Sequence, residues 1–199
     1  MPPKFETVKS FVDVPVTADG VETASFLEAA DGLMDLFDLF GSVVFGFVQT
    51  DLRNNIAGVR ARYAAHESDS ATLECLVKHE AQTQAGERHG TACLVRLVRG
   101  LAFTCKALQE VQSDPQAELH TCFRRSYDVV LKHHHSFVIR SVVTLAIRAV
   151  PHRADFYASI SQGGDVHKLD TELAKWLVAL EAIVVRLSAF LSNGNYGRV

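Results

Sequence analysis

The sequence has little of several features that mark specialised classes of protein. It contains only 5 prolines and 12 glycines among 199 residues, and 22% of its residues are charged against 48% that are hydrophobic. These proportions exclude a disordered or collagen-like chain. The net charge is −3, so the chain lacks the positive field that drives non-specific binding to nucleic acids. We therefore expect a folded globular protein that does not bind DNA or RNA.

Long apolar runs are also missing. The best candidates, residues 39–48 and the arginine-interrupted segment 137–150, fall short of the roughly 18–20 residues of a membrane span. The first residues, Met-Pro-Pro-Lys-Phe-Glu-Thr, carry a charged pair where a signal peptide needs an apolar stretch. These absences predict a cytoplasmic protein without a membrane span.

Motifs for metals, cofactors and catalysis are absent from the sequence. The 4 cysteines (75, 93, 105 and 122) form no Cys-x-x-Cys pair, so we expect buried thiols instead of a zinc module or disulfide framework. The run His133-His134-His135 cannot converge on one metal if it is helical, because consecutive helical residues point about 100° apart. No Gly-x-Ser-x-Gly, phosphate-binding glycine loop or His-Glu-x-x-His is found. We expect no metal, no cofactor and no enzymatic activity.

Helical periodicity dominates the chain. Ser25 followed by Glu28 indicates a capping box that starts a helix ending near Gly41. Asp170 or Thr171 is expected to cap the last helix, which reaches about residue 192. Further apolar stripes predict helices over 42–66, 71–84, 88–111 and 155–160, and one kinked helix or two helices over 116–150, before Pro151.

No segment alternates with the two-residue period of a strand. The predicted fold is all-α, a two-layer helical sandwich of about seven or eight helices. We expect a single domain over residues 23–199, preceded by an N-terminal extension of residues 1–22.

A polar stripe runs along the predicted second helix. Asp51, Asn55, Gly58 and Arg62 stand at i, i+4, i+7 and i+11, on one helical face. Such a stripe is either the solvent-exposed side of the helix or a site for a polar ligand. A carboxylate accepts hydrogen bonds from O–H or N–H groups, and an amide both donates and accepts.

Two arginines interrupt an apolar run in the predicted fourth helix. Arg96 and Arg99 stand three residues apart within residues 94–101. A guanidinium in apolar surroundings needs a carboxylate, a backbone carbonyl or a bound anion as its partner. The two readings are an internal ion pair and a clamp for a phosphate or another headgroup.

These motifs together resemble the glycolipid transfer protein family, whose members carry single sphingolipids between membranes. The resemblance extends over most of the chain. Its motifs are residues 37–45 (FDLFGSVVF) with 50–56 (TDLRNNI), 97–103 (LVRGLAF), Ser126-Tyr127 with 131–137 (LKHHHSF), 151–156 (PHRADF) and Asn195-Tyr196.

The resemblance implies roles for individual residues. Asp51 and Asn55 match the headgroup-binding pair of the family, and Asp51 also takes the amide N–H of the ceramide. His135 matches the histidine that binds the acyl amide oxygen, and Tyr196 matches a C-terminal tyrosine. The expected partners are one sphingolipid and, transiently, a membrane, with the protein acting as a monomer.

Two positions depart from the glycolipid pattern. Gly58 stands where the family has a lysine, and Arg96 replaces the tryptophan that stacks on a sugar ring. Arginine at this position resembles the ceramide-1-phosphate branch, although that branch has a lysine at the position of Asn55 and an arginine at that of Ala92. We therefore favour ceramide-1-phosphate, with Arg99 as a further contact. Arg62 is hypothesised to reach back over Gly58 and supply the missing positive charge.

The alternatives are a glycosphingolipid carrier with an atypical headgroup site and a sphingolipid sensor that binds without transferring. Membrane docking is expected at Phe137, Arg140 and Arg153, unless Phe137 belongs to the core. The candidate lining of an apolar slot for the lipid chains, each residue being otherwise ordinary core, is Phe40, Val44, Phe103, Leu131, Val143, Ile147, Leu180 and Leu187.

Overall fold

The computed structural model describes residues 3–40, 45–84 and 86–199. In these residues the regular elements are helical, apart from two isolated β-bridges, which confirms the all-α prediction. The eight α-helices of the described residues are α1 (Thr23–Phe37), α2 (Phe45–Ala65), α3 (Leu73–Thr83), α4 (His89–Ser113), α5 (Leu119–Val130), α6 (Phe137–Arg148), α7 (Arg153–Ser161) and α8 (Val166–Asn193).

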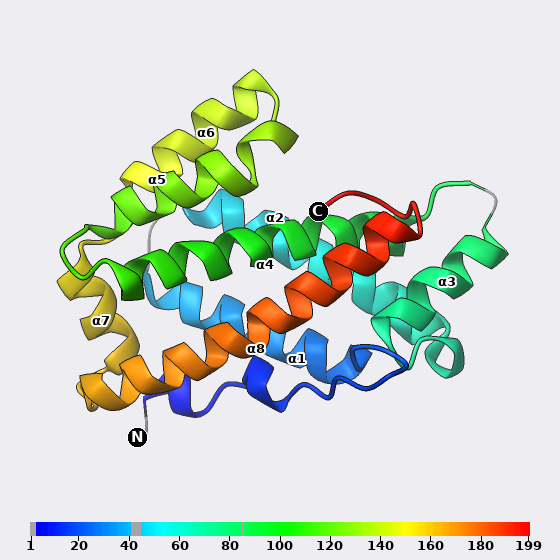
Figure 1. Ribbon diagram of the computed structural model, residues 1–199, viewed down its shortest axis with the longest axis horizontal. Helices are drawn as coiled ribbons and strands as arrows, with labels where there is room; N and C mark the ends of the chain where they lie inside the picture. The colour runs from blue at the N-terminus through cyan, green and yellow to red at the C-terminus, as the bar shows by residue number, and fades with distance from the viewer. Residues whose placement is uncertain (1–2, 41–44, 85) are drawn as a thin grey trace.

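The helices form two layers, as predicted. In Figure 1, α4 and α8 cross the front of the molecule, and α1 and α2 lie behind them. The α5–α6 hairpin stands out at one end and α3 lies at the other. Helix α4 is central, because it packs against α2, α3, α5 and α8.

Two helix starts differ from the prediction. The side chain of Glu22 accepts hydrogen bonds from the backbone N–H groups of Ala24 and Ser25 at 3.2 and 2.6 Å. Glu22 is therefore the N-cap of α1, and the capping box at Ser25 is wrong, because Ser25 already lies in the first turn. Likewise Asp165 caps α8, while the carboxylate of Asp170 accepts hydrogen bonds from other elements.

The segment 116–150 contains two helices. A short 3-10 helix, Lys132–His134, separates α5 from α6, and the side chain of Ser136 caps α6 by accepting from Ile139 N. The three histidines therefore do not lie on one α-helix, in contrast to the helix expected over this segment. His135 follows this 3-10 helix in an extended conformation and leads into α6.

The N-terminal segment packs onto the helical body. Phe11 is buried at 1% exposure, and its ring contacts those of Phe26 on α1 and Trp176 on α8 at centroid distances of 6.0 and 5.3 Å. The buried carboxylate of Glu74 on α3 accepts from Val21 N at 2.8 Å and from Arg186 Nε on α8 at 2.6 Å. Residues 11–22 are thus part of the same core as the helices.

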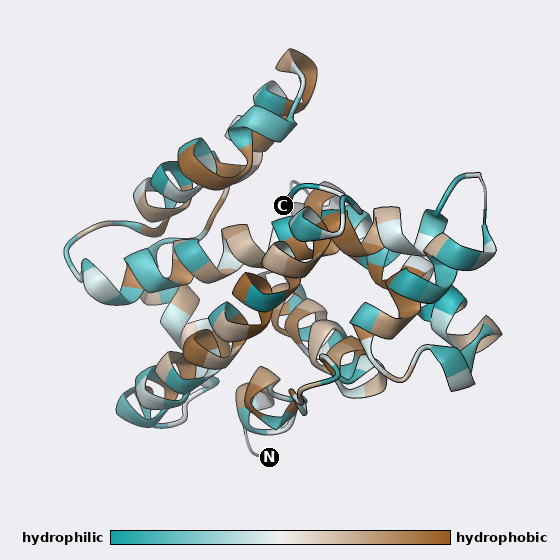
Figure 2. Ribbon diagram, turned by 45° about the vertical axis from the view of Figure 1, so that its right-hand side comes forward, coloured by the Kyte–Doolittle hydropathy of each residue, from teal (hydrophilic) through white to brown (hydrophobic). Residues whose placement is uncertain are grey.

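Apolar residues follow the inner faces of the layers, and Figure 2 shows that they also extend along α6 in the protruding hairpin. No helix among the described residues combines the length and the apolar character needed to cross a membrane.

The packing of Phe11 predicts a large effect of its truncation. We expect Phe11→Ala to lower the free energy of unfolding by about 3–5 kcal/mol, because it leaves a cavity between α1 and α8. Val12→Ala is the matched control, since Val12 is 53% exposed and should cost less than about 0.5 kcal/mol. Chemical denaturation measures both, and equal losses would contradict the packing role of Phe11.

Candidate functional site

Asp51 and Asn55 are coupled by a local hydrogen bond on α2. Asn55 is 3% exposed, whereas Asp51 is exposed. Asn55 Nδ2 donates to the Asp51 backbone oxygen at 2.8 Å and to the Asp51 carboxylate at 3.2 Å. The amide therefore orients the carboxylate, which still has lone pairs for hydroxyl or amide donors of a ligand.

Gly58, one turn further along α2, lies where α2 and α4 cross. A Cβ at this position would stand 2.4 Å from Cys93 Sγ and 3.2 Å from His89 Nε2 of α4. The space above Gly58 is thus filled by α4. A longer side chain at position 58 would collide with Cys93 and His89.

Arg62 does not compensate for Gly58, contrary to the hypothesis. Its side chain is buried, and its guanidinium Nη2 lies 3.0 Å from His79 Nδ1 and 3.3 Å from Thr83 Oγ1. Both partners belong to α3. The aliphatic part of Arg62 passes over Gly90, so its charge is directed toward α3 and away from the Asp51 end of α2.

The two arginines of α4 have different surroundings. Arg96 is exposed, and its guanidinium makes no hydrogen bond or ion pair with any residue that the structure describes. Arg99 is half-buried and donates from Nε to the backbone oxygen of Arg198 at 2.8 Å, and also from Nη2 to the same oxygen. Burial lowers the pKa of Arg99, and the nearby charge of Arg96 adds to the effect.

Cys93 of α4 lies at the crossing with α2, against Gly58. Burial raises the pKa of the Cys93 thiol; the charge of Arg96 acts in the opposite direction, and that of Asp51 adds to the increase. The register of the crossing, with Gly58 against Cys93 and Leu52 against Gly100, sets residues 51–55 of α2 beside residues 96–100 of α4. The packing of these two helices brings the carboxylate and the free guanidinium into one region.

His135 enters this region from the turn before α6. Its Nδ1 lies 3.2 Å from the hydroxyl of Tyr127 on α5. Burial lowers the pKa of His135, although the charge of Asp51 opposes this shift, so the imidazole is neutral at pH 7. With Nδ1 beside Tyr127, Nε2 remains to meet a polar ligand atom. Asp51, Asn55, Arg96 and His135 are called the polar cluster below.

The C-terminal residues lie beside the polar cluster. Tyr196 stacks at a tilt on Phe190, with ring centroids 5.3 Å apart. A Cβ at Gly197 would stand 2.6 Å from Val95 Cγ2 on α4. Because the backbone of Arg198 also binds Arg99, the chain end covers α4 next to Arg96, and Tyr196 itself is turned toward α8.

The structure distributes the predicted slot residues over several elements. Phe103 is half-buried against the rings of Phe123 and Tyr127, and Leu131 is also half-buried. The side chain of Phe40 and the whole of Val44 lie outside the described residues. The buried members are Val143 and Ile147 on α6 and Leu180 and Leu187 on α8.

A cavity of about 380 Å³ opens at a different place, between the N-terminal segment, α1, α7 and the start of α8. None of the predicted slot residues lines it. Helical periodicity predicts that the residues lining this cavity face inward. It does not show where neighbouring helices leave a gap between them. The apolar side chains around it include Leu33, Phe37, Leu108, Phe156, Leu173 and Trp176.

The predicted docking residues also differ from one another. Phe137 is 82% exposed and does not belong to the core. Arg140 is exposed, but its Nε donates to the backbone oxygens of Lys132 and His135 at 3.0 and 2.9 Å. It therefore fixes the turn that carries His135.

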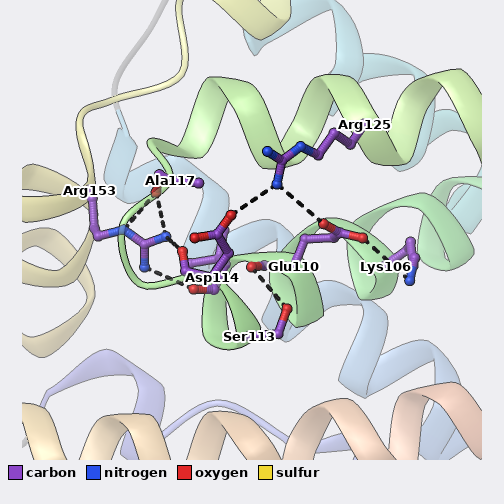
Figure 3. A network of polar contacts seen from close by, with 8 residues as sticks. Lys106, Glu110, Ser113, Asp114, Ala117, Arg125 and Arg153 are labelled. Carbon is purple, nitrogen blue, oxygen red and sulfur yellow. Dashed lines mark hydrogen bonds and ion pairs between the residues drawn. The ribbon is translucent and has the colours of Figure 1, made fainter.

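Arg153 requires a correction. Its guanidinium donates to the backbone oxygens of Val111, Asp114 and Ala117 at 2.5–2.9 Å, and Figure 3 shows it enclosed by the connection between α4 and α5. Arg125 binds the carboxylate of Asp114 on the other side of this connection. Arg153 joins α7 to the α4–α5 turn, so its charge is not available to a membrane surface.

The fold is the all-helical two-layer sandwich that the family resemblance predicts, and the polar cluster lies beside the crossing of α2 and α4. The family model described as glycolipid transfer protein (GLTP) matches residues 21–162. A curated glycolipid transfer protein of Aureobasidium melanogenum is 40% identical over 190 residues, which cover 95% of this chain and 92% of that protein. The chain belongs to the glycolipid transfer protein family.

Solved structures agree with this assignment. The fungal glycolipid transfer protein HET-C2 superposes with a TM-score of 0.88 at 42% identity, covering 95% of this chain and 96% of that one. The human ceramide-1-phosphate transfer protein bound to 12:0 ceramide-1-phosphate superposes with a TM-score of 0.83, covering 97% and 96%. At 18% identity, the second likeness concerns the fold alone.

The crossing at Gly58 predicts a cost of adding a single methyl group. We expect Gly58→Ala to lower the free energy of unfolding by about 1–3 kcal/mol, because Cys93 or the helix backbone must move. Gly46→Ala on the same helix is the control, since a Cβ there meets no described atom within 4 Å. Thermal or chemical denaturation measures both, and an unchanged Gly58→Ala would contradict the tight crossing.

Proposed function

We propose that this protein carries one sphingolipid at a time between membranes, without covalent chemistry. Its family membership and its polar cluster support this function. A sphingolipid has on the order of 30 chain methylenes, and exposing them to water costs roughly 25 kcal/mol. A carrier must therefore shield the chains while it binds the headgroup.

We propose a phosphate as the headgroup, as in ceramide-1-phosphate. The exposed Arg96 carries this proposal, since it is without a partner among the described residues at the position where the family pattern has an aromatic ring. Arg96 and Arg99 supply two positive charges against one carboxylate, that of Asp51. A guanidinium fork matches phosphate oxygens in geometry and charge. Asp51 would accept the amide N–H of the ceramide, and His135 would bind the acyl oxygen through Nε2.

A neutral glycosphingolipid is the second candidate. It is favoured by the Asp51–Asn55 pair, which suits sugar hydroxyls. The relatives at 40–42% identity, moreover, are named glycolipid transfer proteins. A sensor is a further possibility, and it differs from a carrier in that it binds lipid without accelerating its exchange between vesicles.

The headgroup proposal predicts the effect of removing one charge. We expect Arg96→Gln to reduce ceramide-1-phosphate transfer between vesicles by about 10–100-fold, because a hydrogen bond to a charged group is worth about 1.5–3 kcal/mol. Arg60→Gln is the control, since Arg60 pairs with Asp31 on the surface. Native mass spectrometry after incubation with mixed sphingolipids identifies the bound headgroup. Exclusive binding of neutral glycolipids would refute the proposal of a phosphate headgroup.

Transfer also requires brief membrane contact, for which we propose the exposed apolar residues of α6. Phe137, Val138 and Leu145 are all more than half exposed on this helix. Apolar side chains in this position enter the interface of a bilayer, where burial of each contributes about 1.5–3 kcal/mol.

Truncating the most exposed of these side chains tests the contact. We expect Phe137→Ala to slow transfer about tenfold, the equivalent of about 1.4 kcal/mol of membrane binding, with cargo affinity unchanged. Val178→Ala on α8 is the control, because Val178 is exposed to 69% but lies outside this surface. Equal rates for Phe137→Ala and the unmodified protein would exclude Phe137 from docking.

A further inference from the structure

A groove between α5 and α6 gathers positive charge outside the polar cluster. Its volume is about 280 Å³. Four basic side chains line it against one acidic side chain, that of Asp128. The charged and titratable lining residues are His120, Arg124, Tyr127, Asp128, Lys132, Arg140 and Arg148.

The charges of the groove are only partly compensated. Lys132 Nζ binds the carboxylate of Asp128 at 2.7 Å, and Arg140 donates from Nε to two backbone oxygens. The guanidinium groups of Arg124 and Arg148 form no hydrogen bond or ion pair with any described residue, and both side chains are exposed. Two guanidinium groups are therefore free on opposite walls, and the groove as a whole attracts an anion.

The groove lies next to an apolar surface. On α6, Arg140, Thr144 and Arg148 follow one another at intervals of four residues and line the groove. Positions 137, 141 and 145 form the neighbouring row of α6, again at intervals of four residues. Phe137 and Leu145 in this row are exposed. If the apolar row enters a bilayer, the groove lies at the depth of the lipid phosphates.

We propose that this groove binds the phosphomonoester headgroup of an anionic phospholipid in the membrane. This lipid is distinct from the cargo, because the groove shares no residue with the polar cluster. A phosphomonoester carries up to two negative charges and presents several oxygens to the guanidinium groups of Arg124 and Arg148. Binding there orients α6 on the membrane, with the turn that carries His135 nearby, and it selects membranes by their lipids. The inference goes beyond the proposed function and holds for either cargo headgroup.

Flotation of the full chain with vesicles tests the proposal. One set of vesicles contains phosphatidylcholine with phosphatidic acid, which has a phosphomonoester. A second set contains phosphatidylglycerol, a phosphodiester, in the proportion that gives the same electrophoretic mobility. We expect tighter binding to the first set. We expect Arg124→Gln/Arg148→Gln to weaken that binding roughly 30-fold, since each arginine near an anionic surface contributes about fivefold in affinity.

Two controls separate the groove from general charge effects. Arg60→Gln/Lys175→Gln removes the same charge from α2 and α8 and should bind phosphatidic acid vesicles like the unmodified protein. Arg124→Lys/Arg148→Lys keeps the charge but not the planar fork, so it should bind both sets of vesicles about equally. Circular dichroism melting confirms that each variant is folded.

Several outcomes would overturn the proposal. One such outcome is equal binding of the unmodified protein to the two vesicle sets. Another is an equal loss of binding in Arg124→Gln/Arg148→Gln and in Arg60→Gln/Lys175→Gln. Either would show that the protein responds only to non-specific charge. Binding of glycerol 3-phosphate in solution as tight as binding to the vesicles would assign the groove to a free metabolite. Cargo transfer between vesicles of phosphatidylcholine alone is a separate measurement. If the unmodified protein does not transfer cargo there, the proposed carrier function is refuted, without bearing on the groove.

Discussion

The close crossing of α2 and α4 determines where most other parts of this protein lie. Small residues permit it: a Cβ at Gly58 would collide with Cys93, one at Gly90 with Arg62, and one at Gly100 with Leu52, each at 2.4–2.8 Å. Helices that approach this closely fix each other's register, because interior packing does not tolerate even a single extra methyl group without movement. Since α4 also packs on α3, α5 and α8, the arrangement of these helices depends on the same contact.

The polar cluster is a consequence of this crossing. Asp51 and Asn55 lie on α2, Arg96 lies on α4, and His135 lies on a turn that Arg140 and Tyr127 hold in place. None of these elements provides a binding site alone. Together they surround one region with a carboxylate, an amide, a free guanidinium and an imidazole, which are the groups that the proposed binding of a sphingolipid headgroup and amide requires.

Arginine illustrates how one residue type takes different roles in this fold. Arg96 is free of described partners, Arg99 is bound by the chain end, and Arg62 is turned toward α3. Arg153 is bound by backbone oxygens of the α4–α5 connection. The difference is one of surroundings: a guanidinium enclosed by backbone carbonyls stabilises a turn, whereas an exposed one remains available to an anion.

Much of the fold could be predicted from the sequence, because amphipathic stripes are a local property of the chain. Helices were expected close to their observed bounds, and so were the breaks between 84 and 88, between 111 and 116, and at Pro151. The helix starts at Ser25 and Asp170 were wrong because several capping residues compete within a few positions. Tertiary contacts bear on the choice, since Glu22 forms a β-bridge with Thr72 and the carboxylate of Asp170 accepts from Gln112 and Tyr157. The location of the cavity was missed because a gap depends on how neighbouring helices fit together.

The sequence by itself determined the all-helical class, the family and the residue types of the polar cluster, since periodicity, motif order and side-chain chemistry are encoded locally. Only the tertiary structure decided which charges are free. Arg62 and Arg153 carry the same formal charge as Arg96 and Arg124, and nothing local to them shows that their partners lie on other elements. Whether a charge is available to a lipid depends on contacts between residues distant in the chain, and these contacts exist only once the helices have packed.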